Sequence, residues 1–250
     1  MMSRRFTLAA AAAALAVGAG PAAAQTVVGV TDDTIKIGNI MPYSGPASAY
    51  GQIGEAMQAY VEMVNAEGGV NGRQIEFISY DDGYQPPRTV EQARKLVERD
   101  EVAALFATLG TPTTSAIHRY VNARQVPLLF VATGASKWGD PENYPWTMGW
   151  QPDYATEAAI YAKYILDNVE EPRIGILFQN DDYGRDYLGG FKEGLGDQAD
   201  DLIVAEMPYE VADPTVDSQV ISLASEEANV FFNITTPKFA AQAIKKADEI

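Results

Sequence analysis

The 250-residue sequence contains no cysteine and a single histidine, and it carries 34 acidic against 18 basic side chains. Without cysteine the chain has no disulfide, no thiolate metal ligand and no cysteine nucleophile. The net charge of −16 opposes binding to phosphate backbones, so nucleic acid is not an expected partner. The motifs GxxxxGK(S/T), GxGxxG, GxSxG and HExxH do not occur. The sequence therefore favours binding over catalysis, and we expect neither a cofactor nor a metal.

Residues 1–24 have the organisation of a secretory signal peptide. Arg4 and Arg5 precede an apolar stretch over residues 6–17, and the alanines at 22–24 supply an Ala-x-Ala cleavage site. The apolar stretch is too short for a membrane anchor, which takes about 20 residues. We therefore expect export with cleavage, which removes both arginines and changes the net charge from −16 to −18.

After this leader, short apolar runs alternate with amphipathic segments. Most of the runs are apolar almost throughout, as in strands that are covered on both faces of a sheet. We expect strands over residues 35–41, 73–80, 102–109, 126–132, 173–180, 201–209 and 229–235. The clearest helices are expected from Gln52 to the Gly68-Gly69 pair, over 86–100 and over 154–168. This alternation predicts an α/β fold with doubly wound parallel sheets.

The alternation pauses between Ala132 and Tyr154, in a stretch that is rich in proline, glycine and tryptophan. We place a boundary there, with lobe 1 over residues 25–148 and lobe 2 over 149–250. Only three strands follow the boundary, and the sequence stops inside a predicted helix. Lobe 2 is therefore expected to be incomplete in this chain.

Ligands of open parallel sheets bind at the carboxyl ends of the strands, so the loops there are candidate sites. The loop LGTPTTSA follows the third predicted strand, and a helix that begins at TPTTS presents free N–H groups and a positive dipole end. A carboxylate suits such a site. The alternative is that Thr111 or Thr113 caps its own helix. The second hydroxyl-glycine loop, Gly134-Ala135-Ser136, favours the ligand.

Other polar and aromatic residues have weaker signals. His118 falls within a predicted helix beside Arg119, and we expect it to be exposed or partly packed. The Asp81-Asp82 and Asp181-Asp182 pairs lack the spaced ligands of a calcium loop and are interpreted as turn and helix-capping residues. Aromatic side chains in the loops suit either the apolar body of a ligand or packing at the lobe edges; they are Tyr43, Tyr50, Trp138, Trp146, Trp150 and Tyr183.

Four segments make the chain similar to the periplasmic solute-binding proteins of ABC transporters, of the leucine/isoleucine/valine-binding type. They are IKIGNIMPYSGPASAYG, NAEGGVNGRQIEFISYDD, VPLLFVATGAS and QNDDYGRDYLGGFKEGL. The resemblance implies a two-lobed type I periplasmic-binding-protein fold that closes on a small carboxylate like a hinge. It also implies a periplasmic location and an ABC permease as partner, with membrane contact only through that permease.

The resemblance also implies where a ligand binds. In that family, hydroxyls and main-chain N–H groups of lobe 1 hold the ligand's carboxylate, and cleft-lining aromatics come from both lobes. The corresponding positions are Tyr50, Gly110, Thr111, Gly134, Ala135, Ser136 and Tyr183, with Thr133 as a substitute for Ser136. The acidic residue that holds an amino acid's ammonium group is implied to lie beyond residue 250.

Thr235 stands where relatives often have a tyrosine, and this departure leaves the ligand class open. A branched-chain amino acid is the first interpretation, and an aromatic carboxylate is the alternative. The same fold also serves as the ligand-sensing domain of receptors, which is a second functional alternative.

Overall fold

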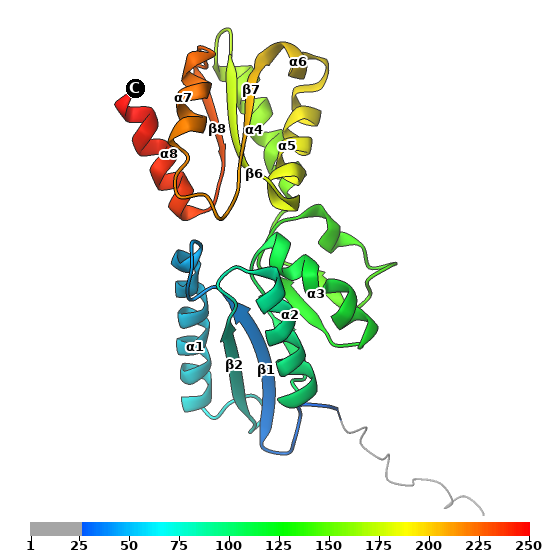
Figure 1. Cartoon of the computed structure of the whole chain (residues 1–250). Helices are drawn as coiled ribbons and strands as arrows, with labels where there is room; N and C mark the ends of the chain where they lie inside the picture. Colours follow the sequence, from blue (N-terminus) through cyan, green and yellow to red (C-terminus); the bar gives the residue numbers. More distant parts are fainter. Residues whose placement is uncertain (1–26) are drawn as a thin grey trace, which may run out of the picture.

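The computed structural model describes residues 27–250, so the predicted signal peptide lies outside the described residues. The chain forms two α/β lobes that are stacked end to end (Figure 1). In the described part, no helix is both long enough and apolar enough to pass through a membrane.

Lobe 1 is built on a five-stranded parallel sheet with the order β2-β1-β3-β4-β5. Its strands are β1 (Thr34–Met41), β2 (Gln74–Asp81), β3 (Ala104–Phe106), β4 (Leu128–Val131) and β5 (Thr147–Gly149). One face is covered by α2 (Pro86–Arg94), which a π-helical turn continues (Lys95–Arg99), and by α3 (Thr111–Ala123). Helix α1 (Gly51–Ala66) packs on the other face (Figure 1).

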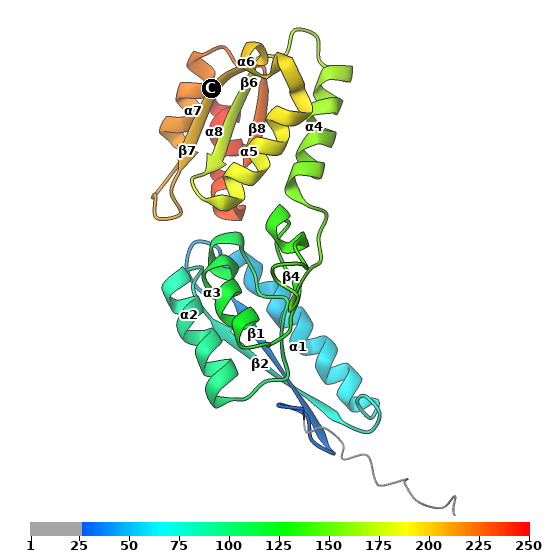
Figure 2. The same ribbon diagram turned by 90° about the vertical axis from the view of Figure 1, so that its right-hand side faces the viewer.

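Lobe 2 has a three-stranded parallel sheet with the order β7-β6-β8. Its strands are β6 (Ile174–Gln179), β7 (Ile203–Tyr209) and β8 (Val230–Ile234). Helices α4 (Tyr154–Asn168) and α5 (Asp182–Leu195) cover one face, and α7 (Asp217–Ser225) and α8 (Pro237–Glu249) cover the other. The short α6 (Ala199–Leu202) leads into β7. Figure 2 shows α4 rising into lobe 2 directly from the junction between the lobes.

The predicted α/β class and all seven predicted strands are confirmed, with two differences. Strand β3 is shorter than its apolar run at both ends, and the residue after it, Ala107, has a left-handed φ of 51°. Strand β5 was not predicted, since three residues in a proline- and glycine-rich stretch show no periodicity. It forms by parallel pairing with β4, where the Leu128 N–H donates to the Trp146 carbonyl at 2.7 Å. The side chain of Asn122 holds the chain just before it by accepting from the Trp146 N–H at 3.0 Å.

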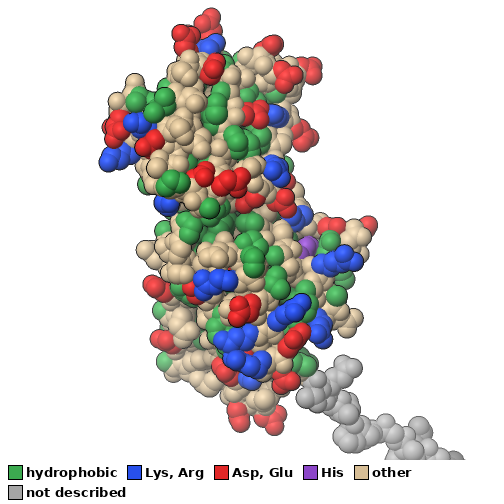
Figure 3. Space-filling model, viewed as in Figure 1, with side chains coloured by type: hydrophobic (Ala, Val, Ile, Leu, Met, Phe, Trp, Pro, Cys, Tyr) green, Lys and Arg blue, Asp and Glu red, His purple; other side chains and the backbone are tan. Residues whose placement is uncertain are grey.

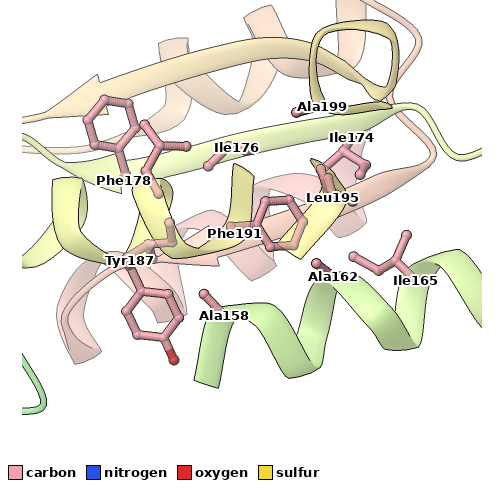
Figure 4. Close-up of a cluster of buried hydrophobic side chains, with 12 residues drawn as sticks. Ala158, Ala162, Ile165, Ile174, Ile176, Phe178, Tyr187, Phe191, Leu195 and Ala199 are labelled. Atoms are coloured by element: carbon pink, nitrogen blue, oxygen red, sulfur yellow. The ribbon is translucent and has the colours of Figure 1, made fainter. Parts of the chain in front are cut away.

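Helices α4 and α5 approach closely over the core of lobe 2 (Figure 4). At Gly190, a Cβ atom would lie 2.3 Å from the Cα of Ala155, so only glycine allows this approach. Phe191 is fully buried beside it and stacks on Phe232, with ring centroids 4.0 Å apart. A Cβ atom added at the preceding residue, Gly189, would meet no other atom within 4 Å.

His118 in α3 is buried, with 6% of its surface exposed. Of the two positions expected for it, exposed or partly packed, the exposed one is wrong. The His118 ring stacks on Tyr144 at 3.9 Å and meets the edge of Trp138 at 5.0 Å. Its buried Nε2 has no hydrogen-bond partner among residues 27–250. Burial, reinforced by the nearby Lys137 ammonium, lowers the pKa of His118 to about 4, so the folded protein holds this imidazole neutral.

The adjacent glycines of α5 provide a matched test of the helix contact. Gly190→Ala should lower the free energy of unfolding by about 1–3 kcal/mol, because the added methyl group clashes with α4. Gly189→Ala should raise it by up to about 1 kcal/mol, because alanine favours a helix. Urea unfolding of both variants measures the difference, and equal stabilities would contradict the close approach.

The buried histidine predicts a loss of stability in acid. Below about pH 6.5 the unfolded chain protonates this imidazole, whereas the folded protein does so only near its own lowered pKa of about 4. The free energy of unfolding should therefore fall as the pH drops through this window. His118→Phe should lose less stability between pH 7.5 and 5 than the unsubstituted protein does. Parallel curves for the two proteins would show that His118 does not cause the loss.

Candidate functional site

A cavity of about 260 Å³, called the junction cavity here, lies between the two lobes. Lobe 1 contributes Tyr50, Tyr84, Gly110, Thr111 and Thr133, and lobe 2 contributes Tyr154, Glu157, Tyr183, Tyr187 and Thr236. Most of these residues follow the carboxyl ends of strands or lie at the starts of helices, and Tyr187 lies in the second turn of α5. Figure 3 shows hydrophobic side chains at the narrowing between the lobes, with acidic side chains close to them.

The structure brings five of the nine predicted site residues to this cavity: Tyr50, Gly110, Thr111, Thr133 and Tyr183. Their assignment to ligand binding stays a prediction, but loops that are far apart in the sequence do place them around one space. Thr133 lines the cavity whereas Ser136 does not, and the substitution of Thr133 for Ser136 in ligand binding stays a prediction.

The other four predicted residues lie nearby but do not line the cavity. The carbonyl of Gly134 accepts a hydrogen bond from the Tyr154 N–H at 2.7 Å, and Ala135 is buried in the core of lobe 1. Ser136 contacts lobe 2 instead of the cavity. Thr235 donates to Asn233 at 2.7 Å, and the next residue, Thr236, is the one that reaches the cavity.

A chain of three hydroxyls crosses from lobe 1 to lobe 2 at the cavity wall. The Oγ1 atoms of Thr111 and Thr133 are 2.6 Å apart, and the hydroxyl of Tyr154 lies 2.9 Å from that of Thr133. Both threonines are almost fully buried, with 1% and 3% of their surfaces exposed. The alternative, that Thr111 or Thr113 caps its own helix, is wrong, because the N-cap is Gly110 and no side chain accepts a hydrogen bond from the first turn. The Thr113 hydroxyl instead donates to the carbonyls of Leu109 and Gly110.

The helices that begin at the junction differ in how their first turns are satisfied. The carboxylates of Asp153 and Asp181 accept hydrogen bonds from the first-turn N–H groups of α4 and α5. The N-cap of α3 is Gly110, which has no side chain to accept such a bond. The first turn of α3 thus keeps donors and a positive dipole end at the cavity, where an anion is favoured.

Gly110 is required at this position for two reasons. Its φ of 96° lies in the region that favours glycine, and a Cβ atom would come within 2.5 Å of the ring of Tyr84. The close approach of this ring to the start of α3 forms one wall of the cavity.

The cavity tyrosines remain protonated donors near neutral pH. Burial, with a smaller effect from Tyr154, raises the pKa of Tyr50 to about 12. Burial is also the main cause that raises the pKa values of Tyr84, Tyr154 and Tyr183. Neutral hydroxyls of this kind donate hydrogen bonds to an anion without bringing charge of their own.

The two lobes also contact each other beside the cavity. The Lys137 ammonium lies 2.6 Å from the carboxylate of Asp182 and donates to Ser115 at 2.9 Å. Ser136 donates to Asp186 from its N–H at 2.8 Å and from its hydroxyl at 3.2 Å. Ser115 belongs to lobe 1, as Lys137 does, so the bridge between the lobes consists of the contacts of Lys137 with Asp182 and of Ser136 with Asp186, called the interlobe clasp here.

Sequence reasoning missed Tyr84, Tyr154, Glu157, Tyr187 and Thr236. Tyr154 begins the helix that the sequence predicts over 154–168, and in the structure it both packs against the core of lobe 2 and lines the cavity. Glu157 follows it at the i+3 spacing, the one available signal that it shares this face. The Asp pairs were interpreted correctly: Asp181 caps α5, and Asp81 accepts N–H bonds in the turn at Ser44 and Gly83.

Comparison with known proteins agrees with this architecture. A family model described as "Periplasmic binding protein" matches residues 34–250. The leucine-specific-binding protein of Salmonella typhimurium is 27% identical over 183 residues, which cover 71% of this chain and 48% of that protein. The Leu/Ile/Val-binding protein homolog 7 of Brucella suis is 24% identical over 246 residues, which cover 95% of this chain and 59% of that protein.

A similar solved structure is the fatty acid ABC transporter substrate-binding protein from Thermomonospora curvata. It has a TM-score of 0.76 and 26% identity, and the match covers 88% of this chain and 56% of that one. The chain spans about half the length of the curated relatives it matches.

Proposed function

Because the chain belongs to the periplasmic binding protein family, we propose that it captures a small carboxylate between its two lobes, outside the cytoplasm, for delivery to an ABC permease. In this role the protein binds its ligand and does not transform it. The membrane is then reached only through the permease.

The observation that carries this proposal is the uncapped start of α3 beside the Thr111–Thr133–Tyr154 hydroxyl chain. A carboxylate at this point receives N–H and O–H donors, and no lysine or arginine is among the cavity-lining residues. Hydrogen bonds to a charged group contribute about 1.5–3 kcal/mol each. Several such bonds together with apolar burial are enough for micromolar binding.

Tyrosine rings from both lobes surround the remainder of the cavity and suit an apolar ligand body. Leucine and fatty acids, which appear in the names of two relatives, are both carboxylates with an apolar body. A branched-chain amino acid or a similar compound therefore heads the proposed ligands. An aromatic carboxylate is the second candidate, favoured by the stacking surface of Tyr154, Tyr183 and Tyr187.

Closure of the lobes follows from the same contacts. A ligand that touches Thr111 in lobe 1 and Tyr183 in lobe 2 binds the closed arrangement better than an open one, so it shifts the population toward closure. The interlobe clasp adds contacts that exist only when the lobes are together.

Calorimetric titration with leucine and with benzoate tests the proposal and separates the two ligand classes. Saturable binding of either compound supports carboxylate capture. The absence of a thermal shift with every member of a panel of amino acids and aromatic acids would contradict it.

Substitutions at the cavity should weaken binding of whichever carboxylate is identified. Thr111→Ala and Tyr183→Ala should each raise the dissociation constant by about tenfold or more, because each removes a contact to the bound ligand. Both variants should keep the fold, as measured by circular dichroism. Tyr164→Ala is the control, since Tyr164 is 64% exposed on α4 and lies outside the junction cavity. Unchanged affinity in both cavity variants would remove these residues from the site.

A further inference from the structure

Glu157 is the one carboxylate among the residues that line the junction cavity. It lies on the first turns of α4, three residues after Tyr154, whose hydroxyl belongs to the hydroxyl chain. Three residues correspond to a rise of about 4.5 Å along an α-helix, and α4 runs away from lobe 1 (Figure 2). Glu157 therefore marks the lobe 2 side of the cavity, and the start of α3 marks the lobe 1 side.

One tyrosine hydroxyl holds this carboxylate in place, since Tyr161 donates a hydrogen bond to it at 3.0 Å. Burial and the neighbouring carboxylate of Glu157 both raise the pKa of Tyr187, so that hydroxyl stays protonated. A carboxylate accepts about four hydrogen bonds, so the one from Tyr161 leaves capacity for a ligand.

No lysine or arginine among residues 27–250 forms an ion pair with Glu157. None of the eight ion pairs within residues 27–250 includes it, and lysine and arginine are absent from the cavity lining. A ligand that fills the cavity removes water from this carboxylate, and an unpaired charge then costs binding free energy. A second carboxylate on the ligand would add repulsion, whereas a cationic nitrogen would remove the cost.

We infer that Glu157 is a specificity-determining residue that selects, among small carboxylates, those that also carry an ammonium group. The ligand's carboxylate lies at the start of α3 and its ammonium group at Glu157, so the two charges meet opposite lobes. This inference rests on the proposed function, since it concerns the second charged group of the same ligand. Glu157 is distinct from the acidic residue that the resemblance places beyond residue 250.

The test uses pairs of ligands that differ only in the ammonium group. Suitable pairs are L-leucine with 4-methylpentanoate, L-phenylalanine with 3-phenylpropanoate, and 4-aminobutanoate with butanoate. Calorimetry should show that the protein binds the ammonium-bearing member of at least one pair about tenfold more tightly, or better, because a partly buried charge pair forms. Glu157→Gln should reduce that preference to about twofold or less, while it preserves the shape of the side chain.

Two control variants separate a local contact from other effects. Glu193→Gln makes the same change in net charge on the exposed surface of lobe 2 and should keep the preference. Tyr161→Phe keeps the charge of Glu157 but removes its donor, so it should also keep the preference. Thermal unfolding of each variant establishes that the lobes remain folded.

The outcomes distinguish this inference from the proposed function. If Glu157→Gln retains the full preference, or if the members without an ammonium group bind as tightly as their partners, the role of Glu157 is overturned while carboxylate capture stands. If no member of any pair binds, the proposed function fails as well. A preference that disappears only in Glu157→Gln supports the inference.

Discussion

The whole arrangement depends on one constraint, which is that every strand of both sheets runs parallel to its neighbours. Parallel strands need crossover helices, so each sheet collects the ends of its strands, and the starts of the following helices, at one edge. In this protein these edges of the two lobes face the same junction. This shared edge is enough to bring the residues of the candidate site together, although they are spread over more than 180 positions of the sequence.

Helix capping then divides the helices that begin at the junction into two kinds. Aspartates occupy the N-caps of α4 and α5 and accept hydrogen bonds from N–H groups there, whereas α3 begins at a glycine and α8 at Thr236, neither with a side-chain cap. An anion therefore finds uncapped helix starts at α3 and α8 but meets carboxylates at α4 and α5. The carboxylate proposed for this cavity depends on these helix starts and on the hydroxyl chain, since no lysine or arginine lines the cavity.

This capping pattern reconciles the proposed carboxylate ligand with the acidic composition of the protein. The net charge of −16 acts over the whole surface and is screened by salt, whereas hydrogen bonds act at contact distance. Burial keeps the cavity tyrosines protonated, so their hydroxyls donate without adding negative charge. Glu157 is the one carboxylate in this lining and has no ion-pair partner among residues 27–250. The cavity therefore favours an anion at the start of α3 and a cation at Glu157.

The sequence by itself determined the α/β class and seven of the eight strands within residues 27–250, because hydrophobic period and turn residues are local signals. It predicted a lobe boundary between Ala132 and Tyr154 and a ligand loop at Gly110 and Thr111. It also indicated Tyr50 and Tyr183 through short motifs that resemble a known family. Only the tertiary structure decided that Tyr154 and Glu157 face the cavity, that Thr236 rather than Thr235 reaches it, and that Ser136 bonds to Asp186. These outcomes depend on how one lobe is placed against the other, and no local pattern records that placement.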